Sequence, residues 1–214
     1  MLTIHHLGVS QSERIIWLCE ELGIPYALKR YQRDPATMLA PAEFKALHPL
    51  GTAPIITDGD LVLPESGAII DYIIGKYGNG RLSVPPSSPE FANYVFWFHF
   101  ANASLMPNMM LPMAFQFAGA SGDHVPALKS LMSRKDSAFA LIEKRLGDAP
   151  YFAGKEFTAA DIIMLFPLTT MRNFCAVDLT HFPNLRAYLK RIGERPAYQR
   201  AMAKGDPEMK PNLG

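Results

Sequence analysis

Residues 51–66 read GTAPIITDGDLVLPES, and this stretch decides the fold of the first half of the chain. Two apolar runs of strand length flank Asp58-Gly59-Asp60, and a glycine at that place tolerates the positive φ that tight hairpin turns require. We therefore expect two antiparallel strands joined by a hairpin.

Pro54 stands at the entrance of the first of these strands, where a proline cannot donate a hydrogen bond to a central ladder. Its bond to Ala53 is either an ordinary trans bond at a strand start or a cis bond. A cis bond would turn the backbone groups of Ala53 outward, where they could pair with an extended peptide ligand as another strand would.

Upstream and downstream of the hairpin, the apolar pattern alternates between strand and helix periods. Helical spacing ends at Gly23 in one segment and at Gly78 in another, as expected for glycine stop signals. The predicted order through residue 78 is βαβαββα, with strands near 2–6, 26–31, 53–57 and 61–63 and helices near 12–23, 42–47 and 66–77.

The sequence VPPSSP at residues 84–89 has the stiff polyproline character of an interdomain linker. Beyond it the strand signals stop, and amphipathic helices are predicted from Phe91 onward, over 128–146, over 159–175 and over 183–192. We expect a mixed-sheet α/β domain over residues 1–80, a linker over 81–89 and an all-helical domain over 90–214.

Thr158 precedes one of these helices and has the side chain of an N-cap residue, which accepts a hydrogen bond from an amide of the first turn. Phe157 can pack onto Ile162 as a hydrophobic staple. Asp161 therefore reads as a structural residue of a helix start and not as a catalytic carboxylate.

The charge balance excludes several classes of partner. The 214 residues include 21 Lys and Arg and 20 Asp and Glu, a formal net charge of +1, so no broad field attracts nucleic acid or an anionic membrane.

The two cysteines, Cys19 and Cys175, have no metal-ligand spacing, so we expect no metal site. No apolar run reaches the ~18 residues of a membrane span, and no leader segment is apparent. We therefore expect a cytoplasmic protein.

Ser10 and Ser12 lie between the first predicted strand and the first helix, where amide groups and the helix dipole stabilise negative charge. A thiol of pKa ~8.5 is only slightly ionised at neutral pH, and one hydroxyl bond of ~1.5–3 kcal/mol could lower that pKa by one to two units. Either serine could bind a thiolate in this way. Alternatively, Ser10 forms a capping box with Glu13 and merely closes the helix.

Glu65 and Ser66 precede the helix that follows the hairpin. Ser66 falls at the predicted N-cap, where free amides suit a ligand carboxylate, and Glu65 could accept a hydrogen bond from a ligand ammonium. Together they could bind the head group of an α-amino acid. The alternative is an N-cap serine beside an exposed glutamate.

Taken together, these motifs resemble the glutathione transferase family across essentially the whole chain. The segment LGVSQSER at residues 7–14 resembles the loop of the serine-type classes, which implies that Ser10, or alternatively Ser12, bonds the glutathione sulfur. The segment HPLGTAP at residues 48–54 resembles the segment whose cis-proline binds the cysteinyl backbone. Glu65-Ser66 resembles the γ-glutamyl site, and the Thr158 region resembles the family's capping motif.

The resemblance implies a thioredoxin-like α/β domain, an all-helical domain and glutathione as co-substrate, held by Ser10, Ser12, Thr52, Ala53, Pro54, Glu65 and Ser66. Many relatives carry Lys, Arg or Gln where Thr52 stands, so the glycine end of glutathione would need another partner, such as Lys45 or Arg33. A homodimer is also implied, through the helices near 66–77 and 91–117.

The second substrate is expected to be a small apolar electrophile or a peroxide, bound between the domains. The candidate pocket residues come from an aromatic and methionine-rich stretch and are Phe98, Phe100, Met106, Met110 and Phe115. The same spacing also suits a helix core. Alternative functions are glutathione-dependent isomerisation, disulfide reduction, or a binding module that has kept the fold without catalysis.

Overall fold

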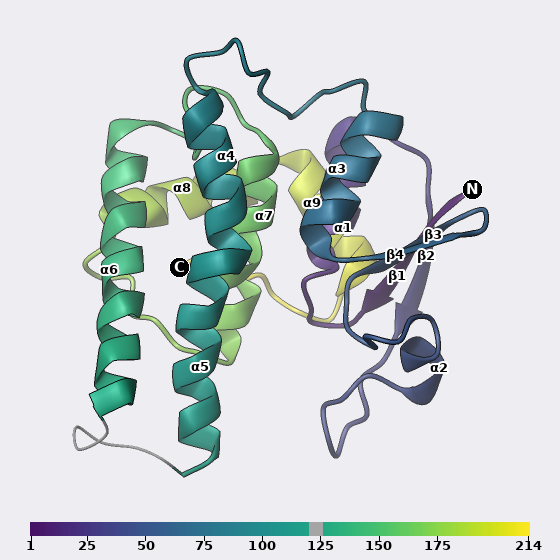
Figure 1. Ribbon diagram of the computed structural model, residues 1–214, viewed down its shortest axis with the longest axis horizontal. Helices are drawn as coiled ribbons and strands as arrows, with labels where there is room; N and C mark the ends of the chain where they lie inside the picture. Colours follow the sequence, from purple (N-terminus) through teal and green to yellow (C-terminus); the bar gives the residue numbers. More distant parts are fainter. Residues whose placement is uncertain (120–125) are drawn as a thin grey trace. The chain divides into compact units, whose positions relative to one another are not determined.

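The computed structural model describes residues 1–119 and 126–214 (Figure 1). The chain forms two compact units. Unit 1 comprises Met1–Ser83 together with Gly193–Pro211, and unit 2 comprises Val84–Ile192 together with Asn212–Gly214.

Unit 1 is built on a mixed four-stranded sheet in the order β2-β1-β3-β4. Strand β1 (Leu2–Leu7) pairs in parallel with β2 (Ala27–Tyr31) and antiparallel with β3 (Ile55–Asp58). Strand β4 (Leu61–Pro64) pairs antiparallel with β3, and Gly59 in the turn between them has a φ of 61°. The predicted hairpin is confirmed.

Three helices complete the predicted βαβαββα order, α1 (Glu13–Leu22), α2 (Ala42–Lys45) and α3 (Ser66–Lys76). Helix α1 ends at Gly23, whose left-handed φ of 64° is readily adopted by a residue without Cβ. Each of the two longer helices buries a row of isoleucines, including Ile15 and Ile16 on α1 and Ile69 and Ile73 on α3. The thioredoxin-like fold predicted for this part of the chain is confirmed.

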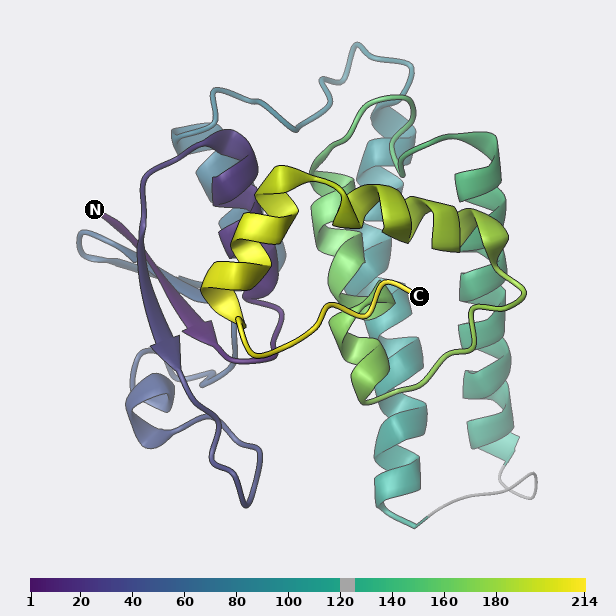
Figure 2. The ribbon, with the colours of Figure 1, turned by 180° about the vertical axis from the view of Figure 1, so that it is seen from behind.

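A fourth helix of unit 1, α9 (Pro196–Gly205), was not predicted from the sequence. It lies along α1, as Figure 2 shows with α9 in yellow and α1 in purple. Trp17 and Tyr198 meet edge to face with their ring centroids 5.2 Å apart. Arg195 binds both carboxylate oxygens of Glu21, at 2.7 and 2.8 Å.

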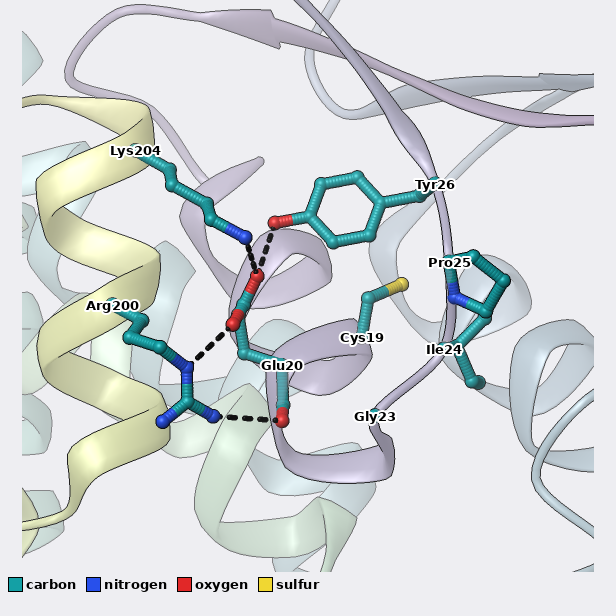
Figure 3. Close-up of a pocket in the computed structure, with 8 residues that line it drawn as sticks. All are labelled: Cys19, Glu20, Gly23, Ile24, Pro25, Tyr26, Arg200 and Lys204. Carbon is teal, nitrogen blue, oxygen red and sulfur yellow. Dashed lines mark hydrogen bonds and ion pairs between the residues drawn. The ribbon is translucent and has the colours of Figure 1, made fainter.

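Glu20 makes a second polar link between α1 and α9 (Figure 3). Its carboxylate accepts hydrogen bonds from Tyr26, Arg200 and Lys204. Burial raises the pKa of Glu20, but these three donors outweigh it and lower the pKa to about 2. The ionised carboxylate therefore stabilises the packing of α9.

Unit 2 is all helical over its described residues, as predicted. Helix α4 (Phe91–Phe100), the π-helical turn η1 (Ala101–Leu105) and α5 (Met106–Phe117) follow one another as one column in Figure 1. The remaining elements are α6 (Pro126–Asp148), α7 (Ala159–Leu168), the 3-10 turn η2 (Thr170–Asn173) and α8 (Pro183–Gly193). The helix predicted over 159–175 was too long, because the backbone leaves helical geometry at Thr169 after Pro167.

The division into domains at residues 80 and 90 stays a prediction, but the packing differs from it in one respect. Residues 193–211, which we assigned to the helical domain, pack with the sheet-containing unit. The reason is the apolar and charged surface of α1, which α9 covers. No helix among the described residues is long and apolar enough to cross a bilayer.

Thr158 caps the start of α7, as the sequence predicted, and it forms a capping box with Asp161. Thr158 Oγ1 accepts from the amide of Ala160 at 3.3 Å. Asp161 accepts from the amides of Thr158, at 2.9 Å, and Phe152, at 3.0 Å, and from the hydroxyl of Tyr188, at 3.2 Å. Burial raises the pKa of Asp161 to about 6, so the carboxylate is ionised at neutral pH.

Replacing Asp161 with Asn should lower the free energy of unfolding by about 2–4 kcal/mol, because one carboxylate oxygen becomes an NH2 group that faces buried donors. Urea denaturation at neutral pH measures the change. Asp148→Asn is the matched control, because exposed Asp148 pairs with exposed Lys144 at 2.7 Å, and this change should leave the free energy of unfolding almost unaltered. Equal losses in both variants would contradict the structural role of Asp161.

The lowered pKa of Glu20 should make the free energy of unfolding depend on pH. Its folded pKa of about 2 lies below the ~4.3 of an unfolded glutamate, so its contribution is fully present above the unfolded pKa and is lost as the pH falls toward 2. In Glu20→Gln, the unfolding free energy should be lower at neutral pH and should fall less between pH ~4.3 and ~2. Denaturant titrations across this pH range measure the unfolding free energy of the wild type and of the variant. The same pH dependence in both proteins would contradict the stabilising role of ionised Glu20.

Candidate functional site

The three sequence motifs meet at one end of the sheet of unit 1. In the strand register, Ile55 pairs with His5 of β1 and with Pro64 of β4. Ala53 and Pro54 therefore lie beside the end of β1 from which the Ser10 loop leaves. Glu65 follows β4 at the same edge, so the sheet collects residues that are far apart in the sequence.

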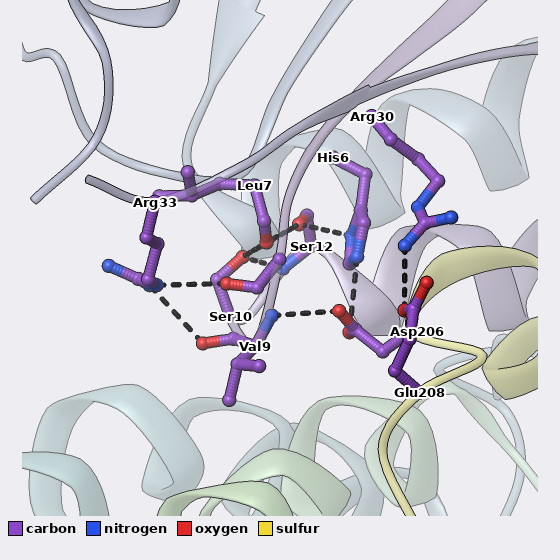
Figure 4. A network of polar contacts seen from close by, with 10 residues as sticks. His6, Leu7, Val9, Ser10, Ser12, Arg30, Arg33, Asp206 and Glu208 are labelled. Atoms are coloured by element: carbon purple, nitrogen blue, oxygen red, sulfur yellow. Dashed lines mark hydrogen bonds and ion pairs between the residues drawn. The ribbon is translucent and has the colours of Figure 1, made fainter. Parts of the chain in front are cut away.

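The loop after β1 is held by two side chains from other segments (Figure 4). Arg33 donates from Nε to the carbonyl of Gly8 at 2.9 Å and from Nη2 to the carbonyl of Val9 at 3.2 Å. Asp206 accepts from the amide of Val9 at 3.0 Å. Val9 has a φ of 52°, which a β-branched residue adopts only when its surroundings impose it, and these bonds supply that constraint.

Ser10 and Ser12 are both buried, and their hydroxyl oxygens lie 2.7 Å apart. Ser10 Oγ also lies 2.6 Å from the carbonyl of Leu7, to which it can donate. Ser12 Oγ lies 2.7 Å from Nδ1 of His6. The two hydroxyls therefore belong to one hydrogen-bonded chain.

The capping-box alternative for Ser10 is wrong. Glu13 is the first residue of α1, and its amide donates to the backbone carbonyl of Ser10 at 3.2 Å, not to the hydroxyl. Ser12 is the N-cap residue, and its side chain makes no capping hydrogen bond. Both hydroxyls are thus committed to the loop and not to closing the helix.

His6 and Asp206 are part of the same site, and the sequence reasoning missed them. His6 Nε2 lies 3.1 Å from Oδ2 of Asp206, and the imidazole is fully buried. A histidine at a buried strand position directly before the serine loop was the available signal for His6. Asp206 gave none, because only the packing of α9 brings it to the end of β1.

The Ala53-Pro54 bond is cis. Of the two alternatives that the sequence left open for this bond, the cis form is therefore confirmed. Pro54 is buried, Ala53 is half-buried and Thr52 is exposed. Of the two side chains suggested in place of a basic residue at Thr52, Arg33 is occupied by backbone carbonyls. The stem of Lys45 runs beside Gly51, where an added Cβ would lie 3.4 Å from Lys45 Cγ.

The prediction that Ser66 is an N-cap residue is wrong by one position. Glu65 is the N-cap of α3 and has a φ of 73°, and Ser66 is the first helical residue. Ser66 is buried, whereas Glu65 is exposed at the helix N-terminus. Glu65, with its positive φ, directly precedes the first amides of α3, and a carboxylate next to free amides suits a ligand that carries both an ammonium and a carboxylate.

Arg14 links the first motif to the third. Its Nη1 donates to Ser66 Oγ at 3.2 Å and to the side-chain oxygen of Gln11. Burial lowers the pKa of Arg14 to about 9, although neighbouring Glu13 opposes the shift. The buried guanidinium thus fixes Gln11 and Ser66 relative to each other inside unit 1.

The residues suggested for an acceptor pocket all lie on the α4–η1–α5 column of unit 2. Phe98 and Met106 are buried, Phe100 and Phe115 are half-buried and Met110 is 46% exposed. Burial of the first two agrees with a core role, so Phe100, Met110 and Phe115 are the better candidates for ligand contact. Within the described residues, no group of three or more His, Cys, Asp or Glu side chains could hold a metal ion.

Both halves of the chain match models of one family. Residues 10–74 match the glutathione S-transferase N-terminal domain, and residues 105–196 match the glutathione S-transferase C-terminal domain. Glutathione S-transferase 3 of Schizosaccharomyces pombe is 33% identical, over 95% of this chain and 88% of its own length.

Similar solved structures are also glutathione S-transferases. A glutathione S-transferase from Actinobacillus pleuropneumoniae has a TM-score of 0.86 and 36% identity, covering 96% of this chain and 93% of its own. A sphingomonad glutathione S-transferase in complex with glutathione shares the fold at 22% identity, with a TM-score of 0.75 over 95% of this chain and 98% of that one. Matched along both units by sequence and by structure, this chain belongs to the glutathione transferase family.

Proposed function

We propose that this enzyme binds glutathione at the end of the sheet of unit 1 and uses Ser10 to keep its sulfur as a thiolate. The observation that carries the proposal is the meeting of the Ser10 loop, the cis Ala53-Pro54 bond and Glu65-Ser66 at one sheet edge. The thiolate would then attack a small apolar electrophile or reduce a peroxide, with the protein supplying proximity and charge stabilisation. Cytoplasmic location fits this use.

Each part of glutathione has a partner of suitable chemistry in this arrangement. The sulfur lies at the Ser10 loop, and the backbone of its cysteine pairs with Ala53 before Pro54. The γ-glutamyl carboxylate docks on Ser66 and the amides of α3, and its ammonium on Glu65. Thr52 and the adjacent Lys45 are the proposed partners of the glycine end.

The choice between Ser10 and Ser12 follows from their places in the hydrogen-bonded chain. Ser12 Oγ is engaged with His6 on one side and Ser10 on the other. Ser10 Oγ lies 2.6 Å from the Leu7 carbonyl, which a thiolate can replace as the acceptor, whereas Ser12 Oγ lies 3.4 Å from the same carbonyl. Ser10 is therefore the proposed sulfur ligand.

Two other activities use the same bound thiolate, namely isomerisation by reversible addition and reduction of disulfides. The reductase version receives no support from the protein's own thiols. Cys19 is buried in α1, and burial, aided by Glu20, raises the pKa of its thiol to about 12. Calorimetric binding of glutathione followed by an assay with an aryl halide separates conjugation from a binding module that lacks catalysis.

In Ser10→Ala, the pH at which bound glutathione ionises should rise by about one to two units, because one charge-assisted hydroxyl bond is lost. Conjugation at neutral pH should fall about tenfold or more. Ultraviolet absorption of the bound thiolate against pH gives the first quantity and steady-state kinetics the second. A larger change in Ser12→Ala than in Ser10→Ala would assign the sulfur to Ser12 instead.

Glu65→Gln should weaken glutathione binding, since a neutral amide replaces the charged partner of the ligand ammonium. We expect a loss of about ten- to a hundredfold in affinity, the size of a hydrogen bond between charged groups. A glutathione analogue without the α-amino group provides the control, because it should bind the wild type and this variant equally. A loss of the same size for both ligands would place the ammonium elsewhere.

A further inference from the structure

Ser10 and Ser12 form one end of a longer chain of hydrogen bonds inside unit 1 (Figure 4). From Asp206 Oδ2 the steps are 3.1 Å to His6 Nε2, 2.7 Å from His6 Nδ1 to Ser12 Oγ and 2.7 Å from Ser12 Oγ to Ser10 Oγ. Each distance is that of a hydrogen bond. A carboxylate, an imidazole and two hydroxyls are thus connected in order, with the proposed sulfur site at the far end.

The protonation state of Asp206, at the inner end of this chain, determines which atom of each group carries a proton. Burial raises the pKa of Asp206, but the hydrogen bonds that His6 and the Val9 amide donate, together with the positive charge of Arg30, outweigh it and lower the pKa. An ionised carboxylate only accepts, so His6 Nε2 carries a proton. In neutral His6 the other nitrogen, Nδ1, is then an acceptor, and Ser12 donates to it.

The same atoms also fit a second arrangement that holds one more proton. Protonated His6 donates from both nitrogens, Ser12 donates to Ser10, and Ser10 donates outward. The links from Asp206 through His6 and Ser12 to Ser10 are hydrogen bonds in both arrangements. Only the Ser10 proton changes its acceptor outside the chain: it is directed to Ser12 in the first arrangement, and in the second it is directed to the Leu7 carbonyl or to a ligand in its place. The chain is built to pass one proton inward from Ser10 to His6.

We propose that His6 takes up the proton of the bound glutathione thiol through Ser10 and Ser12, and that Asp206 is the positioning residue that keeps His6 Nδ1 free to accept it. The inference rests on the proposed function, in which Ser10 holds the sulfur. The thiol S–H bond breaks and its proton goes to Ser10 Oγ, the Ser10 proton goes to Ser12, and the Ser12 proton goes to His6 Nδ1.

The products of this transfer are a thiolate and an imidazolium. The imidazolium lies against the carboxylate of Asp206, and the thiolate accepts the hydrogen bond that Ser10 now donates. No oxidant, metal or further reactant is needed. When product leaves and water replaces the sulfur, the proton can return along the same hydroxyls.

The close packing around His6 shows that this pair is a built feature of unit 1. A Cβ added at Gly205 would lie 3.3 Å from His6 Nε2 and 3.0 Å from Ile16 Cδ1, so a side chain at this position would require the ring or Ile16 to shift by a few tenths of an ångström. His5, the preceding residue of β1, differs: it lies between Tyr31 and Thr57, at 2.9 and 3.1 Å, where it only ties strands together.

Other charged groups near the pair must be considered in any pH profile. Arg30 of β2 and Arg33 of the following loop place positive charge near Asp206, and Glu208 pairs with Arg30 at 3.0 Å. On the helices of unit 1, Glu13 and Arg14 are buried at the start of α1, and Lys204 of α9 binds Glu20. These side chains are unchanged in the variants below, except where stated.

Asp206→Asn tests the positioning role with little change in shape. The amide oxygen can still accept from Val9, while its NH2 group faces His6 Nε2 and forces the ring proton onto Nδ1. His6 can then no longer accept a proton through Ser12. The pH at which bound glutathione ionises should rise by about one unit or more, and turnover at neutral pH should fall roughly tenfold or more.

Two controls separate this role from simple loss of structure. Glu208→Gln makes the same carboxylate-to-amide change two residues away and should leave the ionisation pH and turnover at wild-type values. Ser12→Ala interrupts the relay, so adding Asp206→Asn to it should produce no further rise in the ionisation pH. Calorimetry should show glutathione affinity that changes little in the Asp206 variant.

If Asp206→Asn does not fold, His6→Asn replaces it, because an Asn amide can hydrogen bond near the Nδ1 position but cannot take up a proton. It should raise the ionisation pH by a similar amount. An unchanged ionisation pH in either folded variant, or an equal rise with and without Ser12, would overturn the relay. Failure of the wild type to bind glutathione at all would instead overturn the proposed function, and the relay with it.

Discussion

The buried carboxylate of Asp206 is the interaction on which the site of unit 1 depends. The turn from β1 to α1 leaves an amide, two hydroxyls and an imidazole in the interior, and each would be costly without a partner. Asp206 accepts from the Val9 amide with one oxygen and from His6 with the other. Asp206 therefore fixes both the backbone at Val9 and the hydroxyl chain, while Arg33 holds the carbonyls of Gly8 and Val9.

That arrangement explains why α9 belongs to unit 1 although it lies near the end of the sequence. The aromatic contact of Trp17 with Tyr198 and the ion pairs of Glu20 and Glu21 hold α9 against α1. Asp206 follows α9 directly, so these contacts also set its position. The packing of α9 on α1 thus determines the geometry of the serine loop, although these contacts lie outside the loop.

The sheet brings together the segments that we propose to bind glutathione. Ile55 contributes to two strand pairs at once, so the cis Ala53-Pro54 segment and Glu65 reach the same edge. Arg14 then joins the serine loop to Ser66 through one guanidinium. A tripeptide lying along this edge would meet groups from three segments whose mutual positions are set by hydrogen bonds and not by flexible loops.

The sequence by itself determined what depends on local pattern: the hairpin at Gly59, the βαβαββα order, the helical second half, the helix cap at Thr158 and the serine, proline and Glu65-Ser66 motifs. It placed the N-cap of α3 at Ser66 instead of Glu65 and gave no sign of α9 or Asp206. The reason is physical: turns and helix periods are encoded within a few residues, whereas the partner of a buried imidazole at His6 stands 200 positions away. Only the tertiary structure, by packing α9 on α1, could decide which carboxylate satisfies it.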